Sequence, residues 1–250
     1  MKTALVTGAT SGIGEATARL LAMHNVNLII CGRRADRLAS LKQELTRLVK
    51  VTTCVFDVRD NDAVQAALTP LIKEYQVDIL VNNAGNAHGL GPIHEGDTAD
   101  WDAMIDINVK GLLYVTKIIV PQMVKRQSGQ VINIGSIAGK EVYPNGNVYC
   151  ASKHAVDAIT NGMRMDLNPY GIRVNQISPG LVNTEFSMVR FKGDRNKADA
   201  AYINMIPLVA EDIADIVWFI VSRPAHVTIS DVVVLPTAQA NATLVNRTPD

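Results

Sequence analysis

The sequence predicts an α/β fold in which one doubly wound parallel sheet of about seven strands carries helices on both faces. Short apolar runs alternate with longer amphipathic runs along all 250 residues, as expected for strands joined by crossover helices. The middle strands, such as 79–82, are apolar at nearly every position, which indicates cover on both faces. No linker, repeat or charge block interrupts this pattern, so we expect residues 1–250 to form a single domain.

Each element follows from the local pattern of the chain. Strands are expected at residues 4–7, 27–31, 51–56, 79–82, 130–134, 173–178 and 231–235. Amphipathic helices are expected at residues 14–24, 34–48, 61–75, 101–125, 148–168 and 211–222. The stretch 181–207 breaks the alternation because it is long and mixed in charge. Loops of this length usually serve as lids or binding elements, so we expect it to be a substrate loop.

Composition argues against several classes of function. The 24 basic and 24 acidic residues cancel, so no basic surface points to nucleic acid or to an anionic membrane. The apolar stretches are too short to span a bilayer, and no histidine or cysteine spacing predicts a metal site. Three cysteines cannot form a full disulfide framework, and the first residues contain no apolar leader. A reducing, cytoplasmic location is therefore expected.

The first expected strand ends in a glycine-rich turn, Thr7-Gly8-x-x-x-Gly12-x-Gly14, and a helix follows at once. Glycines let the backbone turn tightly and let a pyrophosphate approach, while the helix N-terminus offers free N–H groups and a positive dipole end. The same glycines could form a purely structural turn. Their position between a strand and a helix favours a dinucleotide site.

The second expected strand ends at Gly32-Arg33-Arg34. An NAD site usually has an acidic residue here for the ribose 2′-OH, whereas a guanidinium suits a 2′-phosphate. The alternative is a solvated helix start, although cations are disfavoured at that end of a helix. We therefore predict NADP(H) rather than NAD(H). Asp57 and Asn82-Asn83-Ala84-Gly85 end later strands at the same ligand-binding edge of the sheet.

The motif most suggestive of chemistry is Tyr149-x-x-x-Lys153 within the expected helix 148–168. Side chains at positions i and i+4 share one helix face, so the phenol and the ammonium can meet. A tyrosine ordinarily titrates near pH ~10, and an adjacent cation is expected to lower that pKa. Ser136 ends the fifth strand at the ligand edge, and Asn108 interrupts an otherwise helical run with a polar side chain.

In order and spacing, these motifs resemble the short-chain dehydrogenase/reductase family, which has the Rossmann type of doubly wound sheet. The resemblance covers almost the whole chain. The matching motifs are Thr7-Gly8-x-x-x-Gly12-x-Gly14, Asp57, Asn82-Asn83-Ala84-Gly85, Asn108, Ser136, Tyr149-x-x-x-Lys153 and Pro179-Gly180. It implies an NADP-dependent oxidoreductase acting on a CH–OH group, with a small-molecule substrate.

The resemblance also implies a role for each site residue. Tyr149 would be the general acid/base, and Lys153 would bind the nicotinamide ribose and lower the tyrosine pKa. Ser136 would polarise the substrate carbonyl, and Asn108 would kink its helix and hold a water in a proton relay. Thr184 would contact the nicotinamide carboxamide. The implied cofactor-binding residues are Gly8, Thr10, Ser11, Gly12, Ile13, Gly14, Arg33, Arg34, Asp57, Val58, Asn83, Ala84, Gly85, Tyr149, Lys153, Pro179, Gly180, Val182 and Thr184.

A narrower resemblance is to the NADP-dependent 3-hydroxy acid dehydrogenases, which oxidise serine-like and 3-hydroxy acids and reduce malonic semialdehyde. The resembling stretches are residues 32–34, 146–149, 184–187, 189–194 and 224–227. The expected substrate-binding residues are Ser136, Asn147, Tyr149 and Arg190. A bidentate Arg190 would suit a carboxylate, although it could instead bridge to an acidic neighbour in its own loop.

Other interpretations stay open. Within the family, a general ketone, sugar or 3-oxoacyl carrier reductase is the alternative, and a non-enzymatic NADP-sensing protein is a second. By resemblance, we expect a homo-oligomer, either a dimer or a tetramer, packed through helices 101–125 and 148–168 and through the last strand. The polar tail 239–250 is expected to dock on a neighbour or to be disordered.

Overall fold

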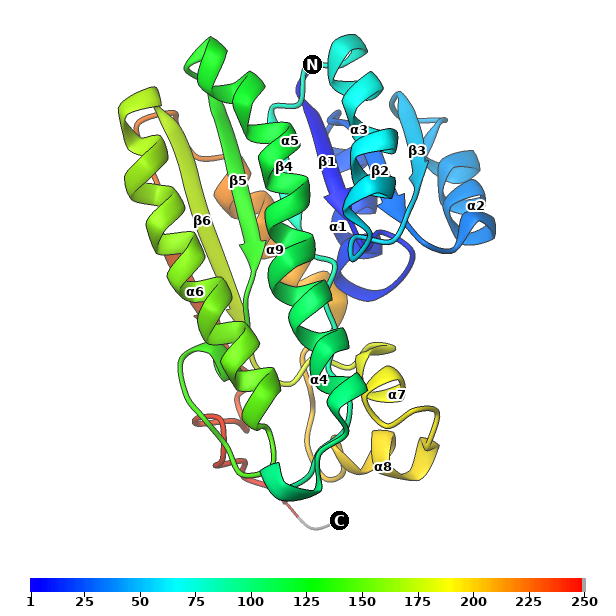
Figure 1. Cartoon of the computed structure of the whole chain (residues 1–250), viewed down its shortest axis with the longest axis vertical. Helices are drawn as coiled ribbons and strands as arrows, with labels where there is room; N and C mark the ends of the chain where they lie inside the picture. The colour runs from blue at the N-terminus through cyan, green and yellow to red at the C-terminus, as the bar shows by residue number, and fades with distance from the viewer. Residues whose placement is uncertain (249–250) are drawn as a thin grey trace.

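The computed structural model describes residues 1–248 and contains one seven-stranded sheet in the order β3-β2-β1-β4-β5-β6-β7 (Figure 1). The strands are β1 (Thr3–Thr7), β2 (Asn27–Gly32), β3 (Val51–Val55), β4 (Ile79–Asn82), β5 (Gly129–Ile134), β6 (Ile172–Pro179) and β7 (Asp231–Val234). Every pairing between neighbours is parallel. The strand order reverses direction between β1 and β4, which opens a crevice at the carboxyl ends of the strands. The predicted doubly wound parallel sheet is confirmed.

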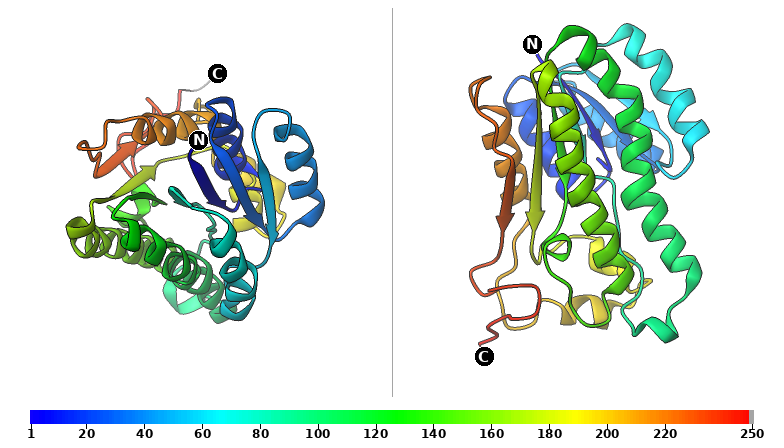
Figure 2. Two further views of the ribbon diagram at one scale, coloured as in Figure 1. Left: turned by 90° about the horizontal axis from the view of Figure 1, so that it is seen from above. Right: turned by 60° about the vertical axis from the view of Figure 1, so that its left-hand side comes forward.

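Helices cover both faces of this sheet (Figure 2). One face carries α1 (Gly12–Met23), α2 (Ala35–Leu45) and α9 (Ala210–Val221), and the other carries α3 (Asn61–Glu74), α5 (Gly111–Arg126) and α6 (Asn147–Leu167). Successive residues of β1 divide between the two cores. Ala4 and Val6 pack with the first set of helices, whereas Leu5 packs with the second. This alternation is the two-residue period of a strand, and it explains why the central strands are apolar at every position.

The expected single helix 101–125 consists of three pieces in the structure. They are α4 (Thr98–Ile105), a π-helical segment η2 (Asp106–Lys110) and α5. The extra residue per turn lets Asn108 point inward, where it is buried. Such π segments occur preferentially at functional sites, and a 3.6-residue periodicity in the sequence does not reveal them. Short 3₁₀ turns complete the chain at η1 (Ile93–Glu95), η3 (Ile137–Gly139) and η4 (Asn168–Tyr170).

The substrate loop, residues 181–207, lies beyond the carboxyl ends of the strands and contains two short helices, α7 (Phe186–Arg190) and α8 (Arg195–Ala200) (Figure 1). Its two ends are held together, because the Asn183 amide donates to the Leu208 carbonyl at 2.8 Å and the Leu208 amide donates to the Leu181 carbonyl at 3.0 Å. None of the helices within residues 1–248 combines the length and the apolar character needed to cross a membrane.

Candidate active site

A cavity of ≈ 1120 Å³ lies between the strand ends and the substrate loop. This volume is at the upper end of what small-molecule sites require, so a dinucleotide and a small substrate fit together. All the predicted cofactor residues except Gly14 line it, and so do Ser136 and Arg190. The cavity wall does not include Asn108 or Asn147.

The glycine-rich turn is fixed against the turn that follows β4. The Thr7 hydroxyl accepts hydrogen bonds from the backbone amides of Asn83 and Ala84, both at 3.0 Å. The Asn83 side-chain amide donates to the Thr7 carbonyl at 2.9 Å. Gly8 has a φ of +67°, and a side chain at Gly14 would begin 2.4 Å from the Gly8 carbonyl oxygen. The glycines are therefore required for this close approach of backbone segments.

At the second strand, the two predicted arginines differ in how they are held. Arg34 donates through Nη2 to the hydroxyls of Thr10, at 3.0 Å, and Ser11, at 2.8 Å. Arg33 is only within 3.6 Å of Asp57, whose carboxylate is held more closely by Arg59. Burial alone would raise the pKa of Asp57, but its bonds to Arg59 hold that pKa below the ordinary value. The Arg33 guanidinium is thus loosely held and able to meet an anion.

On the other side of the crevice, α6 brings Tyr149 and Lys153 to the cavity wall, and both side chains are buried. The Lys153 ammonium donates to the Ile134 carbonyl at 3.0 Å. Burial lowers the pKa of Lys153 from 10.5 to about 8. Gly85 makes room for this group, since a side chain there would begin 2.9 Å from Asn108 Oδ1 and 3.6 Å from Lys153 Nζ.

The pKa of Tyr149 does not move in the direction expected from its lysine neighbour. Burial raises it, the nearby Tyr143 adds to the rise, and the Ser136 hydroxyl and Arg190 oppose it. The physical reason is that removing water from the phenolate outweighs the nearby cations, while the Lys153 ammonium is directed at a carbonyl. The chain alone therefore keeps Tyr149 protonated at neutral pH, which suits a proton donor.

Asn108 holds the floor of the site from the π segment. Its amide nitrogen donates to the Asn86 carbonyl at 2.8 Å and to the Ser152 hydroxyl at 3.0 Å. Its carbonyl oxygen accepts from the Asn86 amide at 2.9 Å. The side chain therefore ties the segment after β4 to α6, the helix that carries Tyr149 and Lys153, and it lies behind the cavity wall.

Arg190 provides a cation in the cavity wall beside Tyr143 and Tyr149. Its Nε donates to the Gly89 carbonyl at 3.1 Å, and its Nη1 donates to the Tyr143 hydroxyl at 3.0 Å. The guanidinium carbon lies 5.6 Å from the ring centroids of both Tyr143 and Tyr149. The remaining nitrogen, Nη2, is buried and has no hydrogen-bond partner among residues 1–248. No acidic neighbour in the described chain neutralises Arg190, so the alternative of a bridge within its own loop finds no support here.

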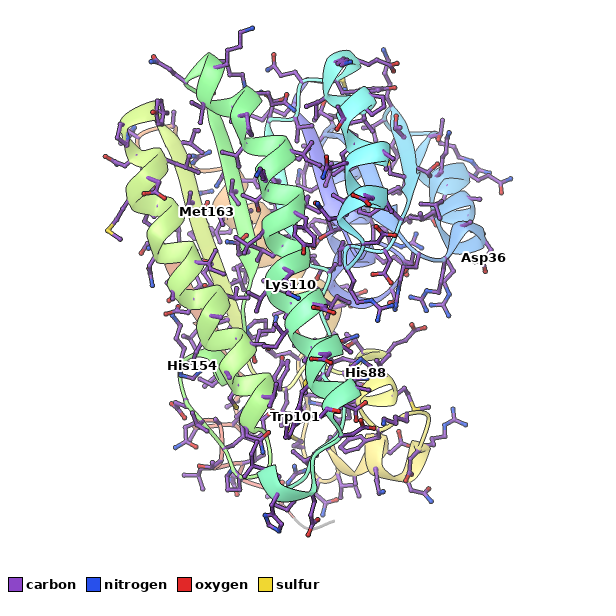
Figure 3. The ribbon with its side chains drawn as sticks, in the orientation of Figure 1. Asp36, His88, Trp101, Lys110, His154 and Met163 are labelled. Atoms are coloured by element: carbon purple, nitrogen blue, oxygen red, sulfur yellow. The ribbon has the colours of Figure 1, made fainter. Side chains whose placement is uncertain are left out.

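Asn147 is directed elsewhere, since its amide donates to the Gly91 carbonyl at 3.1 Å. His88 lies beside α4 and α7 in Figure 3 but is not part of the cavity wall, and burial lowers its pKa. Neither residue is brought to the reacting end of the cavity.

Three features of the site were not predicted from the sequence. Tyr143 lines the cavity beside Arg190, and Glu185 is bonded to Arg34. The tail from Gln239 onward also forms part of the cavity wall. The side-chain oxygen Oε1 of Gln239 accepts a hydrogen bond from the Leu181 backbone amide at 2.8 Å, and Arg247 donates to the Ala201 carbonyl at 3.0 Å. The described part of the tail thus packs on its own substrate loop, which corrects the expectation of a disordered segment. Docking of the tail on a neighbouring subunit stays a prediction, and residues 249–250 lie outside the described residues.

Comparisons with known proteins show the family of the chain. The sequence model of the short chain dehydrogenase family matches residues 2–195. The chain belongs to the short-chain dehydrogenase family. One relative within that family is a protein of Salmonella typhi named NADP-dependent 3-hydroxy acid dehydrogenase YdfG. It is 46% identical over 242 residues, which cover 96% of this chain and 97% of the relative.

Two other members of the short-chain dehydrogenase family are comparably similar. A protein of Chromohalobacter salexigens named sulfoacetaldehyde reductase 2 is 44% identical over 238 residues, with 94% of each chain covered. A solved structure described as the closed form of serine dehydrogenase complexed with NADP+ superimposes with a TM-score of 0.92. It is 43% identical, and the match covers 99% of this chain and 100% of the other.

Proposed function

We propose that this chain is an NADP-dependent oxidoreductase that transfers hydride between NADP(H) and a small 3-hydroxy acid or 3-oxo acid. Serine-like substrates and malonic semialdehyde are the expected examples. The observation that carries the substrate class is the half-buried Arg190 guanidinium, which lies against the Tyr149 ring and whose Nη2 is buried without a partner in the described chain. A partly desolvated cation beside the proposed proton donor favours a substrate with an anionic head group.

The residues of this chain fit the cofactor. The turn has glycines at positions 8, 12 and 14, where the backbone carries no side chain, and it leads into the N-terminus of α1. Arg33 and Arg34 offer cations for a 2′-phosphate beside this turn. Thr184 and Lys153 would face the nicotinamide end. When bound, NADP(H) supplies or accepts the hydride at its nicotinamide ring.

The proton side of the reaction is assigned to Tyr149. In reduction, its phenol would donate a proton to the carbonyl oxygen of the substrate as that oxygen gains charge. In oxidation, the same oxygen would accept the proton of the substrate hydroxyl. Ser136 would donate a second hydrogen bond to the substrate oxygen. Lys153, whose ammonium donates to the Ile134 carbonyl, would bind the nicotinamide ribose.

A second substrate class deserves a direct comparison. A relative named sulfoacetaldehyde reductase 2 suggests a short aldehyde that carries a sulfonate, and Arg190 could hold that anion by the same charge. We favour the carboxylate because a guanidinium forms two parallel hydrogen bonds to its two coplanar oxygens. Kinetics with a matched carboxylate and sulfonate aldehyde would separate the two.

The decisive test is the substitution Arg190→Ala. We expect kcat/KM for a 3-hydroxy acid to fall roughly 10–150-fold, since a hydrogen bond to a charged group is worth about 1.5–3 kcal/mol. The loss should fall mainly on KM, and turnover of a small neutral alcohol should change little. NADPH absorbance measures both. Arg195→Ala is the matched control, because Arg195 is an exposed cation of the same loop outside the cavity wall.

Each outcome of this test assigns a function. If Arg190→Ala leaves KM for the acid unchanged, the hydroxy acid assignment is wrong and a general ketone, sugar or acyl-carrier reductase becomes the better hypothesis. If the unmodified chain binds NADPH but turns over no member of a panel of 3-hydroxy acids, sulfonates and ketones, it is an NADP-sensing protein.

We also propose a homo-oligomer, a dimer or a tetramer, in the cytoplasm. Exposed apolar side chains on the helices and last strand expected at the interfaces support the assembly: Leu113, Met165 and Val233. Light scattering measures the number of subunits. The three cysteines are free and buried, which fits a reducing compartment.

A further inference from the structure

Two arginines of the α2 region converge on one carboxylate of the substrate loop. Arg34 Nη1 lies 2.8 Å from Glu185 Oε2, and Arg37 Nη1 lies 2.6 Å from Glu185 Oε1. All three side chains are about half exposed. Partial burial would raise the pKa of Glu185, but the bonds to the two arginines hold that pKa below its ordinary value. The carboxylate is therefore ionised and engaged through both oxygens.

This contact crosses the cofactor channel. Glu185 directly follows Thr184, whose side chain lies within 3.2 Å of where a side chain at Gly12 would begin. The loop therefore passes over the glycine-rich turn before Glu185 reaches the arginines. Asp36, which lies between Arg34 and Arg37 in the sequence, is labelled in Figure 3 at the lower end of α2. This end of α2 is on the side of the sheet where the carboxyl ends of the strands lie. Glu185 thus joins the first residues of α7 to the adenosine end of the cavity.

The cation cluster still has capacity for a phosphate. Arg34 is shared between Glu185, Thr10 and Ser11, whereas Arg33 has only a 3.6 Å approach to Asp57. Arg33, Arg34 and Arg37 bring three positive charges, and Glu185 neutralises one of them. A dianionic 2′-phosphate can therefore bind on the Arg33 side while Glu185 keeps its bonds, and it would restrain Arg34 further.

We infer that Glu185 is a positioning residue that ties the substrate loop to the 2′-phosphate site, so that NADP(H) stabilises the docked loop more than NAD(H) does. This inference rests on the proposed function in one respect, the assignment of NADP(H) as the cofactor. The proposed substrate class matters only for the measurement of KM. A single exposed ion pair contributes little. Two arginines that are held by further hydrogen bonds provide a more rigid anchor than one such pair. Because coupling between two sites acts in both directions, a docked loop would also favour binding of the 2′-phosphate.

Limited trypsin digestion tests the coupling without any substrate, because Lys192, Arg195 and Lys197 lie in the loop and mass spectrometry locates each cut. In the unmodified chain, saturating NADP+ should slow cleavage at these sites about tenfold more than saturating NAD+ does. In Glu185→Gln, which removes the charge and keeps the shape, this difference should fall below about twofold. KM for a 3-hydroxy acid should rise several-fold, and kcat should stay nearly constant.

Further variants separate anchoring from general loosening of the fold. Arg37→Gln should show part of the Glu185→Gln effect, because Arg34 still holds Glu185. The double variant should be no worse than Glu185→Gln alone, because that change already removes the contact with Arg37. Glu44→Gln breaks a surface pair with Arg19 between α1 and α2 and should behave like the unmodified chain.

Three results would overturn the inference: NADP+ protection of Glu185→Gln equal to that of the unmodified chain, additive effects of Glu185→Gln and Arg37→Gln, or equal protection by NAD+ and NADP+ before any substitution. An unmodified chain that is inactive toward 3-hydroxy acids would count against the proposed substrate class alone, since the digestion does not require turnover.

Discussion

The two ends of the cavity are built in different ways. At the end proposed to be catalytic, Asn108, Ser136, Tyr149 and Lys153 are each at most 9% exposed, and they come from the turn after the central strand β5, a long helix and a π segment. At the loop end, Glu185 and Arg34 are about half exposed, and short helices are held by ion pairs and by backbone hydrogen bonds.

This difference indicates a division of labour. The groups proposed to exchange protons are fixed in the buried part of the molecule, where burial shifts their pKa values. The groups proposed to recognise the substrate and the 2′-phosphate lie on segments whose attachment is polar and can be released at low cost. Changes at the catalytic end should therefore affect kcat and stability, whereas changes at the loop end should affect KM.

The largest effect is expected from Tyr149→Phe. Loss of the phenolic oxygen removes the proton donor and should lower kcat roughly 10²–10⁴-fold, while the dissociation constant of NADPH, measured by fluorescence, stays within about twofold. Tyr170→Phe, at the far end of α6, is the control. Retained turnover in Tyr149→Phe would remove this residue from the mechanism and break the contrast between the two ends.

A pH experiment isolates the burial of Lys153. Its pKa falls from 10.5 to about 8 on folding, so between these values the unfolded chain binds more protons than the folded chain. The free energy of unfolding therefore rises with pH between the folded and the unfolded pKa of Lys153. Below the folded pKa, the buried ammonium lowers the free energy of unfolding. The difference in free energy of unfolding between the unmodified chain and Lys153→Met should change by roughly 2–3 kcal/mol from pH ~7.5 to pH ~10.

Denaturant unfolding at several pH values measures this difference. Lys125→Met, at an exposed position of α5, should show no comparable pH dependence. If the difference in free energy of unfolding between the unmodified chain and Lys153→Met does not change with pH, the ammonium is solvated. The two ends of the cavity would then be alike in their exposure to water.

The smallest effect is expected at the tail. Gln239→Ala removes the acceptor for the Leu181 amide and should loosen the base of the substrate loop by roughly 1 kcal/mol. KM for the acid should rise several-fold with kcat nearly unchanged, and exposed Gln65→Ala serves as the control. An equal fall in kcat would show that the tail supports the catalytic end as well.

The parts of the molecule that were predictable depend on short-range patterns. The glycine-rich turn and Tyr149-x-x-x-Lys153 are local motifs, and their positions after a strand and on a helix follow from periodicity. The order of these motifs then brings them to one edge of a parallel sheet. The expected helix 101–125 differed from the structure because burial of the Asn108 amide, a tertiary contact, selects the π segment.

The loop end could not be predicted in the same way, because its contacts join residues far apart in the chain. Glu185 meets Arg34 across 151 positions, and Gln239 meets Leu181 across 58. The raised pKa of Tyr149 also depends on burial, which no spacing in the sequence reveals. Asn147 was expected at the substrate because it is close in sequence to Tyr149, but its amide is bonded to a neighbouring loop.

The contact between Arg247 and the substrate loop has a practical consequence for handling the protein. The C-terminal end of the described chain lies on the side where the loop covers the cavity, whereas the N-terminus emerges at the opposite end of the sheet (Figure 1). A purification tag or a fluorescent fusion attached at the carboxyl side would crowd the loop that covers the cavity. Fusions and surface immobilisation should therefore be made through Met1.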